Sequence, residues 1–314
     1  MKHYFIINPF AGPVDITNSI RKRIESYEEW IEFDWETYVT TGPGDAAVYT
    51  SLLCQEHPDE PIRIYACGGD GTLNEVVTGA MGHPNVQVTL YPAGSGNDFL
   101  RYYGTKGDFL DIDRLIEGEP HAVDVMRIVV GRGEDAPVRY CFNVLGMGFD
   151  AAVGRNMQRI KRFPIIGGKH AYNTSVIFSF LFSRKNPYRV TVDGELFADK
   201  PVLFCTLNNG RYEGGGFCGA PFARNDDGLL DIYKIKPLSA FRFYSLVNIY
   251  RVGEHVDSPS CKDIIEFRQG TDVVIECPKR MPLIIDGEIL MSDYYHVELL
   301  HNAFDFVVPK GLEY

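Results

Sequence analysis

The spacing of apolar residues in the first third of the chain alternates between two periods. Short apolar runs typical of strands are followed by segments in which apolar residues recur every three or four positions, as on one face of a helix. This alternation indicates βαβ units and hence a parallel sheet, whose ligands bind at the carboxyl ends of the strands. The predicted strands lie at 3–7, 33–39, 62–67 and 87–91, and the predicted helices at 16–27, at 45–55 and from residue 72.

The pattern changes near residues 118–121, after which strand-like runs dominate. We therefore predict two domains: an α/β domain over residues 1–121 and a β-rich, sandwich-type domain over residues 122–302, with residues 303–314 as a candidate return to the first. Helical stretches at 151–161 and 171–182 interrupt the second domain. Its predicted strands lie at 125–130, 139–143, 189–192, 202–207, 230–235, 273–277 and 283–286.

Composition and net charge indicate which classes of protein fit this chain and which do not. The 314 residues are 45% hydrophobic and 23% charged, as in ordinary globular proteins, and the formal net charge of −11 argues against sequence-independent nucleic-acid binding. Seven cysteines, an odd number without a C-x-x-C pair, fit a reducing compartment. The longest apolar stretch, residues 176–182, is too short to cross a bilayer, and no signal-peptide pattern is evident. We expect a cytoplasmic protein with no transmembrane segment and no nucleic-acid partner.

A glycine-rich segment, Gly-Gly-Asp-Gly-Thr at 68–72, follows the third predicted strand. Glycines let backbone N–H groups approach a phosphate closely. Thr72 with Glu75 forms a capping-box pattern, which predicts a helix that starts here and directs its positive end at the same place. The alternative interpretation is a tight turn that needs glycine for positive φ angles.

Two further loops repeat this pattern. The segment 92–99 (Pro-Ala-Gly-Ser-Gly-Asn-Asp-Phe) follows the fourth predicted strand and pairs Ser95 with Asp98 as a second helix-start signal. The segment 8–12 (Asn-Pro-Phe-Ala-Gly) follows the first strand. Since the carboxyl ends of parallel strands share one edge of a sheet, we expect the three loops to converge. Three such loops point to a nucleotide polyphosphate.

Other motif-like patterns are less specific. Gly214-x-Gly216-x-x-Gly219 matches the dinucleotide fingerprint, yet no helical pattern follows it, so we expect a loop. The acidic segment 225–228 lacks the first and last ligands of a calcium loop. The eight histidines show no metal-ligand spacing.

Together these residues resemble the diacylglycerol kinase catalytic family, which includes bacterial lipid kinases. The resemblance implies a two-domain fold, with an α/β nucleotide domain and a β-sandwich domain. The motif at 68–72 is shared with NAD kinases and phosphofructokinases, whereas Asn74 and the loop at 92–99 favour the lipid branch. The segments that carry the resemblance, in the family's order, are 68–75, 94–99, 143–151, 209–216, 220–223, 227–231 and 286–288.

The resemblance also implies roles for particular residues. Asp286 would be the general base, and the Asp227 carboxylate would bind Mg²⁺ with the backbone carbonyls of Arg224 and Leu229. The implied ATP site consists of Asn8, Pro9, Phe10, Ala11, Gly12, Thr41, Gly68, Gly69, Asp70, Gly71, Thr72, Leu73, Asn74 and Ser95.

One departure concerns charge. The family often has a basic residue just after the Asn-Pro-x-x-Gly turn, whereas residues 13–15 here are Pro-Val-Asp. Neutralisation of phosphate by this loop is therefore in doubt, and it stays open whether Arg21 or Lys22 substitutes.

Phosphoryl transfer to an alcohol needs positioned phosphates, neutralised charge and a carboxylate near the acceptor hydroxyl. Both Asp193 and Asp286 begin an Asp-Gly-Glu segment; Asp193 lies in a predicted hairpin turn, and the family order favours Asp286. We expect an ATP-dependent lipid kinase that phosphorylates diacylglycerol or a related lipid alcohol, reached peripherally at the membrane, to give phosphatidic acid or an analogue. An NAD kinase-type enzyme and a catalytically silent nucleotide- or lipid-binding protein are the alternatives, and homodimerisation stays open.

Overall fold

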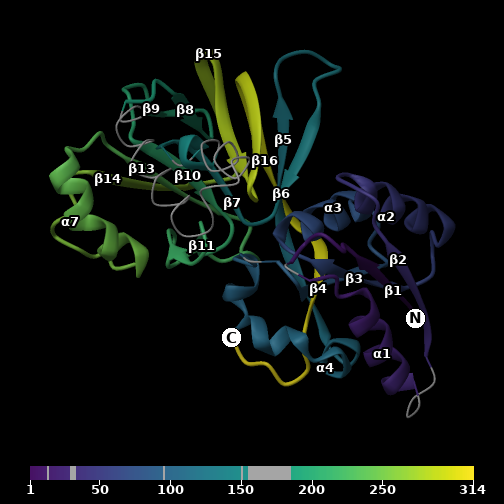
Figure 1. Cartoon of the computed structure of the whole chain (residues 1–314). Helices are drawn as coiled ribbons and strands as arrows, with labels where there is room; N and C mark the ends of the chain where they lie inside the picture. Colours follow the sequence, from purple (N-terminus) through teal and green to yellow (C-terminus); the bar gives the residue numbers. More distant parts are fainter. Residues whose placement is uncertain (13, 29–32, 95, 150, 155–184) are drawn as a thin grey trace. The chain divides into compact units, whose positions relative to one another are not determined.

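The computed structural model describes residues 1–12, 14–28, 33–94, 96–149, 151–154 and 185–314 (Figure 1). The chain divides into two compact units, and strands β5 (Glu119–Val130) and β16 (Glu288–Val308) contribute residues to both. The first unit contains Met1–Val125, Gly214–Gly216 and His301–Tyr314, and the second contains Met126–Glu213 and Phe217–Leu300.

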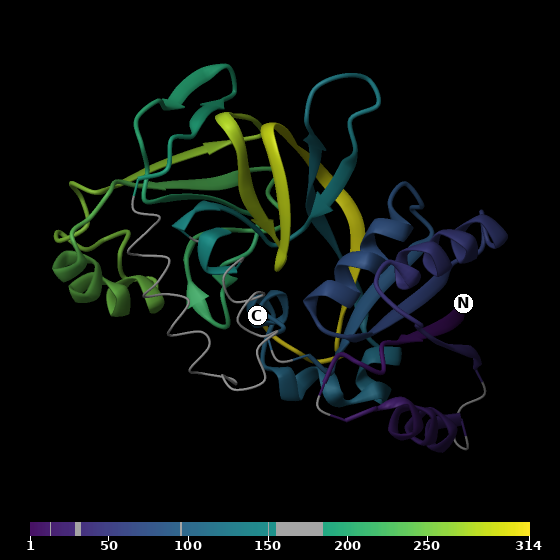
Figure 2. The same ribbon diagram turned by 45° about the horizontal axis from the view of Figure 1, so that its top comes forward.

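The first unit is built on a parallel sheet with the strand order β16-β4-β3-β1-β2. Helices α2 and α3 lie on one face of this sheet and α1 and α4 on the other (Figure 1, Figure 2). The last part of β16 joins the sheet beside β4, where Phe306 pairs with Val88. The elements are β1 (Lys2–Ile7), α1 (Thr17–Glu28), β2 (Asp34–Val39), α2 (Asp45–Glu56), β3 (Ile62–Gly68), α3 (Asp70–Ala80), β4 (Val86–Pro92), the 3₁₀ helices η1 (Phe99–Tyr102) and η2 (Lys106–Leu110), and α4 (Ile112–Ile116).

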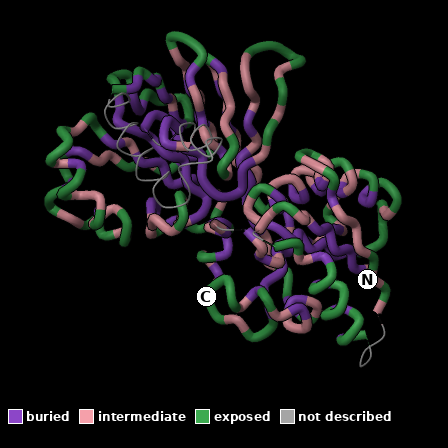
Figure 3. The backbone as a smooth tube through the Cα atoms, in the orientation of Figure 1, coloured by how far each residue is buried: buried purple, intermediate pink, exposed green. Residues whose placement is uncertain are grey.

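Burial in this unit follows the periods seen in the sequence. Helix α1 buries Ile20, Ile24 and Tyr27, which share one face, while most residues between them are exposed. Strand β3 is buried at all seven positions, because helices cover both faces of a parallel sheet (Figure 3).

The order of the strands creates a switch point between β1 and β3. The chain runs from β1 to the neighbouring β2, and then returns to β3 on the other side of β1. In the register of these strands Ile7 lies opposite both Val39 and Cys67, so the three strands end at the same level. Ligands of open α/β sheets bind at such a point, outside the carboxyl ends of the strands.

The second unit contains an antiparallel sheet with the order β14-β13-β10-β7-β15-β16, from which β8, β9, β5 and β6 branch. Its largest core cluster gathers residues of these strands, among them Leu145, Leu207, Ile232 and Leu283. The elements are β6 (Val138–Cys141), β7 (Val144–Gly148), β8 (Arg189–Val192), β9 (Glu195–Ala198), β10 (Phe204–Asn208), β11 (Tyr212–Glu213), β12 (Phe217–Cys218), β13 (Leu230–Ile235), α7 (Ala240–Arg251), β14 (Ile265–Gly270) and β15 (Asp272–Ile285).

The predicted fold class, a parallel α/β region followed by a β-rich region, is confirmed. The predicted strands at 273–277 and 283–286 are one strand, β15, with an irregularity between Glu276 and Met281. The apolar pattern did not reveal β7, because its Val-Leu-Gly-Met-Gly sequence lacks alternation, and it did not reveal α7 or β14. The predicted helix at 171–182 lies outside the described residues, and of the one at 151–161 only the helical residues 151–154 are described. Nowhere in the described part of the chain is a helix both long enough and apolar enough to cross a bilayer.

Candidate active site

Three glycine loops meet at the carboxyl ends of β1, β3 and β4. The Asn8 side chain donates from Nδ2 to Thr72 Oγ1 at 3.0 Å, which joins the first loop to the second. The N–H of Gly94 donates to the carbonyl of Gly68 at 3.0 Å, which joins the second loop to the third. A Cβ on Gly12 would lie 2.8 Å from the carbonyl oxygen of Ala93, so the first and third loops also touch.

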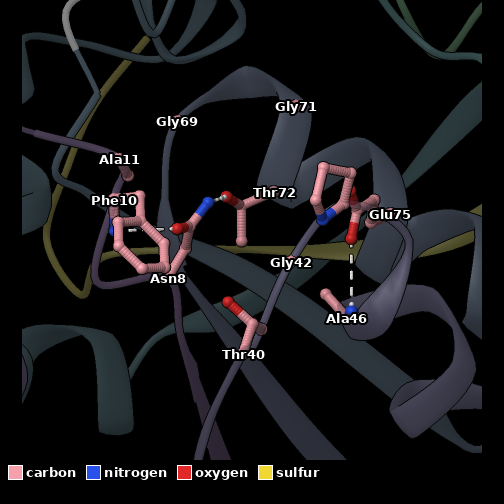
Figure 4. Close-up of a pocket in the computed structure, with 11 residues that line it drawn as sticks. Asn8, Phe10, Ala11, Thr40, Gly42, Ala46, Gly69, Gly71, Thr72 and Glu75 are labelled. Carbon is pink, nitrogen blue, oxygen red and sulfur yellow. Dashed lines mark hydrogen bonds between the residues drawn. The ribbon is translucent and has the colours of Figure 1, made fainter.

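A pocket of about 310 Å³ opens beside these loops (Figure 4). Six of its lining residues belong to the predicted ATP site, and they come from the loop after β1, from the N-cap of α3 and from its first turn. The other five come from the loop after β2, from α2 and from α3. The lining residues are Asn8, Phe10, Ala11, Thr40, Gly42, Pro43, Ala46, Gly69, Gly71, Thr72 and Glu75.

Helix α3 begins differently from the prediction. It starts at Asp70 with Gly69 as its N-cap, three residues before Thr72, the N-cap that the capping-box pattern indicated, and the N-cap makes no side-chain capping bond. The capping box is therefore wrong. Thr72 accepts a hydrogen bond from Asn8, and the Glu75 carboxylate accepts from the N–H groups of Gly44 at 2.8 Å and Ala46 at 3.2 Å. The N-cap Gly69 provides no side-chain capping bond, and the positive end of the helix dipole lies at the pocket that Gly69, Gly71 and Thr72 help to line.

The glycines at 68–71 are not there to provide positive φ angles. None of Gly68, Gly69 and Gly71 is among the residues with positive φ, so the tight-turn alternative is wrong. Close packing leaves no room for a Cβ on Gly68, which would lie 2.2 Å from Thr72 Oγ1, and little room for one on Gly69, which would lie 3.2 Å from Gly94 Cα. A Cβ on Gly71 would meet nothing within 4 Å. Neither its backbone angle nor packing against the described residues explains Gly71, which lines the pocket.

Asp70 links two loops rather than lining the pocket. Its Oδ2 atom accepts from the N–H groups of Asn97 at 2.7 Å and Asp98 at 3.3 Å. Its Oδ1 atom is buried and has no hydrogen-bond donor among the described residues. Burial, and after it the neighbouring Asp98 carboxylate, raise the pKa of Asp70 above its usual value. Asp70 therefore holds the third loop against the start of α3.

The helix start predicted at Ser95 lies outside the described residues. The next described element is the four-residue 3₁₀ helix η1, whose N-cap Asp98 makes no capping hydrogen bond with its side chain. The Asp98 carboxylate instead accepts from the N–H of Gly215 at 2.7 Å and pairs with Arg101 at 3.2 Å. Gly215 belongs to the tip of the β11–β12 hairpin, so the fingerprint-like glycine pattern at 214–219 covers a hairpin tip and the two-residue strand β12, with no helix directly after it.

The remaining residues of the predicted ATP site lie around the pocket without lining it. Thr41 donates from its N–H and its hydroxyl to Asp45 Oδ2, at 2.7 and 2.8 Å, and so shapes the loop after β2. Leu73 is fully buried and packs in the core. The lining residues of the β2–α2 loop were not predicted, although the Gly-Pro-Gly segment at 42–44 was a visible signal. The predicted residues that do not line the pocket are Pro9, Gly12, Thr41, Gly68, Asp70, Leu73 and Asn74.

Asp286 occupies a two-residue turn between β15 and β16, where Ile285 pairs with Glu288. Its φ angle is 42°, which is unusual for a residue other than glycine. Its carboxylate accepts from the N–H of Phe142 at 3.2 Å and from the N–H of Val144 at 3.4 Å, and the Cys141 thiol donates to Oδ1 at 3.4 Å. Burial, and then Asp286 itself, raise the pKa of the Cys141 thiol well above its usual value, so the thiol stays protonated and can donate.

The predicted Mg²⁺ ligands lie in the turn before β13. Asp227 is exposed, and its Oδ1 accepts from the N–H of Leu229 at 3.0 Å, while Arg224 pairs with Asp226. Asp231 ends the segment 227–231 of the family resemblance but received no predicted role; it is buried, and its Oδ2 atom has no hydrogen-bond partner among the described residues. Burial raises the pKa of Asp231, and the nearby Asp227 carboxylate adds to this shift. Asp227 in the turn and Asp231 in β13 each carry carboxylate oxygens, the ligand type that a hard cation prefers.

A second acidic group contains a histidine that spacing in the sequence did not reveal. Strand pairing brings single ligand atoms of Asp272, His296 and Glu298 within 4.8 Å of one another. Each is already matched, because His296 contacts Asp272 at 2.6 Å and Arg127 pairs with Glu298 at 2.6 Å. These contacts across neighbouring strands account for the closeness of the three side chains without a metal ion.

Comparison with known proteins assigns the chain to a family. Residues 2–128 match the "Diacylglycerol kinase catalytic domain", and residues 143–308 match the "YegS C-terminal NAD kinase beta sandwich-like domain". A protein of Chromohalobacter salexigens named "Probable lipid kinase YegS-like" is 30% identical over 256 residues, covering 79% of this chain and 76% of that protein. The chain therefore belongs to the diacylglycerol kinase catalytic-domain family, and the predicted resemblance is confirmed.

Two further comparisons agree with this assignment. A protein of Staphylococcus carnosus named "Diacylglycerol kinase" is 29% identical over 288 residues, which cover 90% of this chain and 87% of that protein. A crystal structure of a diacylglycerol kinase from Bacillus anthracis has a TM-score of 0.67 at 22% identity, covering 99% of this chain and 98% of that one, and shows that the fold is shared. Membership of a kinase family implies ATP use.

Proposed function

We propose that this protein is an ATP-dependent lipid kinase. It would transfer the γ-phosphate of ATP to the hydroxyl of diacylglycerol or a related lipid alcohol and release phosphatidic acid, or an analogue, and ADP. The family and the names of the relatives support the lipid class, and the lipid would be reached peripherally at a membrane surface.

One observation carries the nucleotide part of the proposal. Three glycine loops meet at the strand ends beside a pocket, and the first turn of α3 lies there. Backbone N–H groups and a helix dipole of about +0.5 charge favour phosphate oxygens. Gly71 supports the same interpretation, because a side chain there would enter open space that a bound phosphate chain needs.

Asp286 is proposed as the general base. Its carboxylate would accept the proton of the lipid hydroxyl while the hydroxyl oxygen forms a bond to the γ-phosphorus and the bond from that phosphorus to the β-phosphate oxygen breaks. The N–H groups of Phe142 and Val144 and the Cys141 thiol hold the carboxylate in place. Since all three are donors, they orient the charged form that accepts a proton.

Mg²⁺ is proposed to bind at the turn before β13. The Asp227 carboxylate would bind it, helped by the carbonyls of Arg224 and Leu229, and the orphan oxygen of Asp231 suits the same ion. A cation there would neutralise the two carboxylates and stiffen the turn. At a family level Mg²⁺ also neutralises phosphate charge during phosphoryl transfer.

An assay with radiolabelled ATP tests the proposal directly. The full chain is incubated in mixed micelles with a panel of lipid alcohols that includes diacylglycerol, and in parallel with NAD. Labelled phosphatidic acid or another phospholipid is the expected product. Efficient labelling of NAD with no lipid labelled would support the NAD kinase-type alternative, and labelling of neither would favour a silent binding protein.

Substitution of Gly71 tests the nucleotide pocket. Gly71→Val should leave the unfolding temperature nearly unchanged, because a Cβ there meets no atom within 4 Å, and should abolish ATP binding. Gly69→Val is a less clean test, because its side chain would press on Gly94 and disturb the loops. Full ATP affinity in Gly71→Val would place the nucleotide elsewhere.

A further inference from the structure

The pocket proposed for ATP lacks positive charge. None of its lining residues is basic, and one of them, Glu75, is acidic. The helix dipole of α3 offers only about half a charge, which is small against the several negative charges of a triphosphate. Residues 13–15, next to the first loop, add none. Binding of a triphosphate here therefore needs a basic side chain that does not line the pocket but reaches the glycine loops.

Most basic side chains of the first unit are engaged elsewhere. Arg23 pairs with Asp113 at 3.0 Å and Arg101 with Asp98 at 3.2 Å. Arg63 is buried and donates to Gln87 and to carbonyls of α4. Arg21, one of the two candidates left open by the sequence, donates to Thr37 within β2 at 3.2 Å. Arg23, Arg63 and Arg21 are held away from the glycine loops by these contacts, whereas the charge of Arg101 is paired with Asp98 of the third loop.

Lys106 is different, because its ammonium lies on the third glycine loop. Nζ donates to the carbonyl of Gly94 at 2.9 Å, and Gly94 packs against Gly69, the N-cap of α3. The position is held by a capping box at the start of η2, in which Thr105 and Asp108 bond each other reciprocally. Lys106 thus places a charge beside the turn that begins α3.

The contact with Gly94 does not by itself explain the lysine. The same carbonyl already accepts a hydrogen bond from Asn97 Nδ2 at 2.8 Å, so it is satisfied without Lys106. Lys106 is exposed and forms no ion pair with any described carboxylate. An ammonium has three N–H donors, and Lys106 uses one of them in the bond to the Gly94 carbonyl. The positive charge of Lys106 and its other two donors are available to a ligand.

We propose that Lys106 binds the phosphate chain of the nucleotide and supplies the charge that residues 13–15 do not. This inference rests on the proposed function, since it needs a nucleoside triphosphate at the glycine loops. It assigns the ligand class by chemistry: an anion with several phosphates gains from the ammonium, whereas the nucleoside alone does not.

Calorimetric titration of the full chain with ATP, ADP and adenosine tests the inference. Lys106→Met should weaken ATP binding by about 10- to 100-fold, the range for loss of a hydrogen bond between charged groups, and weaken ADP less. Adenosine binding should not change, whereas mere loosening of the loop would weaken all three ligands. Lys106→Arg keeps the charge and should bind ATP within a few-fold of the unsubstituted protein. ATP affinity should also fall less steeply with salt in Lys106→Met.

Lys22→Met is the matched control, since Lys22 is an exposed lysine of the same unit on α1. It should bind ATP normally, and unfolding temperatures near that of the unsubstituted protein confirm that both variants are folded. Normal ATP affinity in Lys106→Met would overturn the inference, and weakening in Lys22→Met or Arg21→Met instead would assign the charge to α1. An unsubstituted protein that binds no nucleotide would overturn the proposed function itself.

Discussion

The chain contains two Asp-Gly-Glu hairpins that are locally alike and differ in their surroundings. Asp193 and Gly194 join β8 to β9, and Asp286 and Gly287 join β15 to β16. Both pairs have positive φ, 47° and 80° in the first and 42° and 90° in the second, as two-residue hairpin turns require. The turn geometry therefore does not distinguish them.

The partners of the two carboxylates do distinguish them. Asp193 is exposed, and its Oδ1 accepts from the N–H groups of Thr271 and Asp272 and from the Thr271 hydroxyl. Asp286 is half-buried, and its third donor is the thiol of the buried Cys141. A half-buried carboxylate with oriented donors is better suited to proton transfer than an exposed one that closes a loop. The same three residues thus form two turns whose carboxylates have different surroundings.

The largest difference should appear in catalysis. Asp286→Asn keeps the shape of the side chain and removes its basicity, so kcat should fall by about 10²- to 10⁴-fold, the range for lost general-base catalysis. ATP affinity should stay nearly constant, because the glycine loops and not Asp286 are proposed to bind the nucleotide. Steady-state kinetics with the preferred lipid measure both values.

Asp193→Asn is the control for this experiment. It should keep kcat, because its carboxylate only accepts hydrogen bonds from the loop at 271–272, and an amide oxygen can do the same. If Asp193→Asn loses activity while Asp286→Asn keeps it, the base has been assigned to the wrong hairpin.

Substitution of Gly194 and of Gly287 should have similar effects on stability, because both glycines have positive φ angles. A Cβ at Gly194 or at Gly287 meets nothing within 4 Å, so only the left-handed backbone penalises a side chain. Each substitution to alanine should lower the free energy of unfolding by about 1–2 kcal/mol, and by similar amounts. Urea titration measures this. Gly287→Ala alone should also reduce kcat, since it disturbs Asp286; equal activity in both variants would argue that neither turn is catalytic.

The smallest difference in kcat between the two hairpins should come from the side-chain donors to the two carboxylates, the Cys141 thiol and the Thr271 hydroxyl. Cys141→Ala removes the thiol that donates to Asp286, and Thr271→Val removes the hydroxyl that donates to Asp193. A thiol is a weak donor, so kcat in Cys141→Ala should fall by only about 2- to 5-fold. Thr271→Val should leave kcat unchanged. A large loss in Cys141→Ala with a lowered unfolding temperature would mean that the thiol serves packing instead.

Much of the first unit could be predicted from the sequence. Burial on one face of α1 and throughout β3 produces periods that short windows reveal, and the glycine loops stand out because they interrupt those periods. Strands β7 and β14 and helix α7 were missed because their apolar pattern is weak: only Phe243 of α7 is buried. Their formation depends on neighbours that are distant in the chain.

The sequence predicted the outline of the candidate site, but several details of that prediction were wrong. The loops converge as expected because the parallel strands end in register. The capping roles of Thr72 and Glu75 were wrong, since Asn8 and the start of α2 offer them partners from other segments. Lys106 could not be found by motif, because nothing near it in the sequence relates it to Gly94.

The sequence by itself determined what depends on a few consecutive residues: the βαβ alternation, the glycine loops after strands and the two Asp-Gly turns. These features follow from backbone angles and side-chain periods, which act over short distances along the chain. The tertiary structure decided which glycines are needed for packing, that Asp70 ties two loops together, and which Asp-Gly turn receives a buried thiol. Those outcomes depend on contacts between residues far apart in the sequence, and only the packing of whole elements brings such residues within bonding distance.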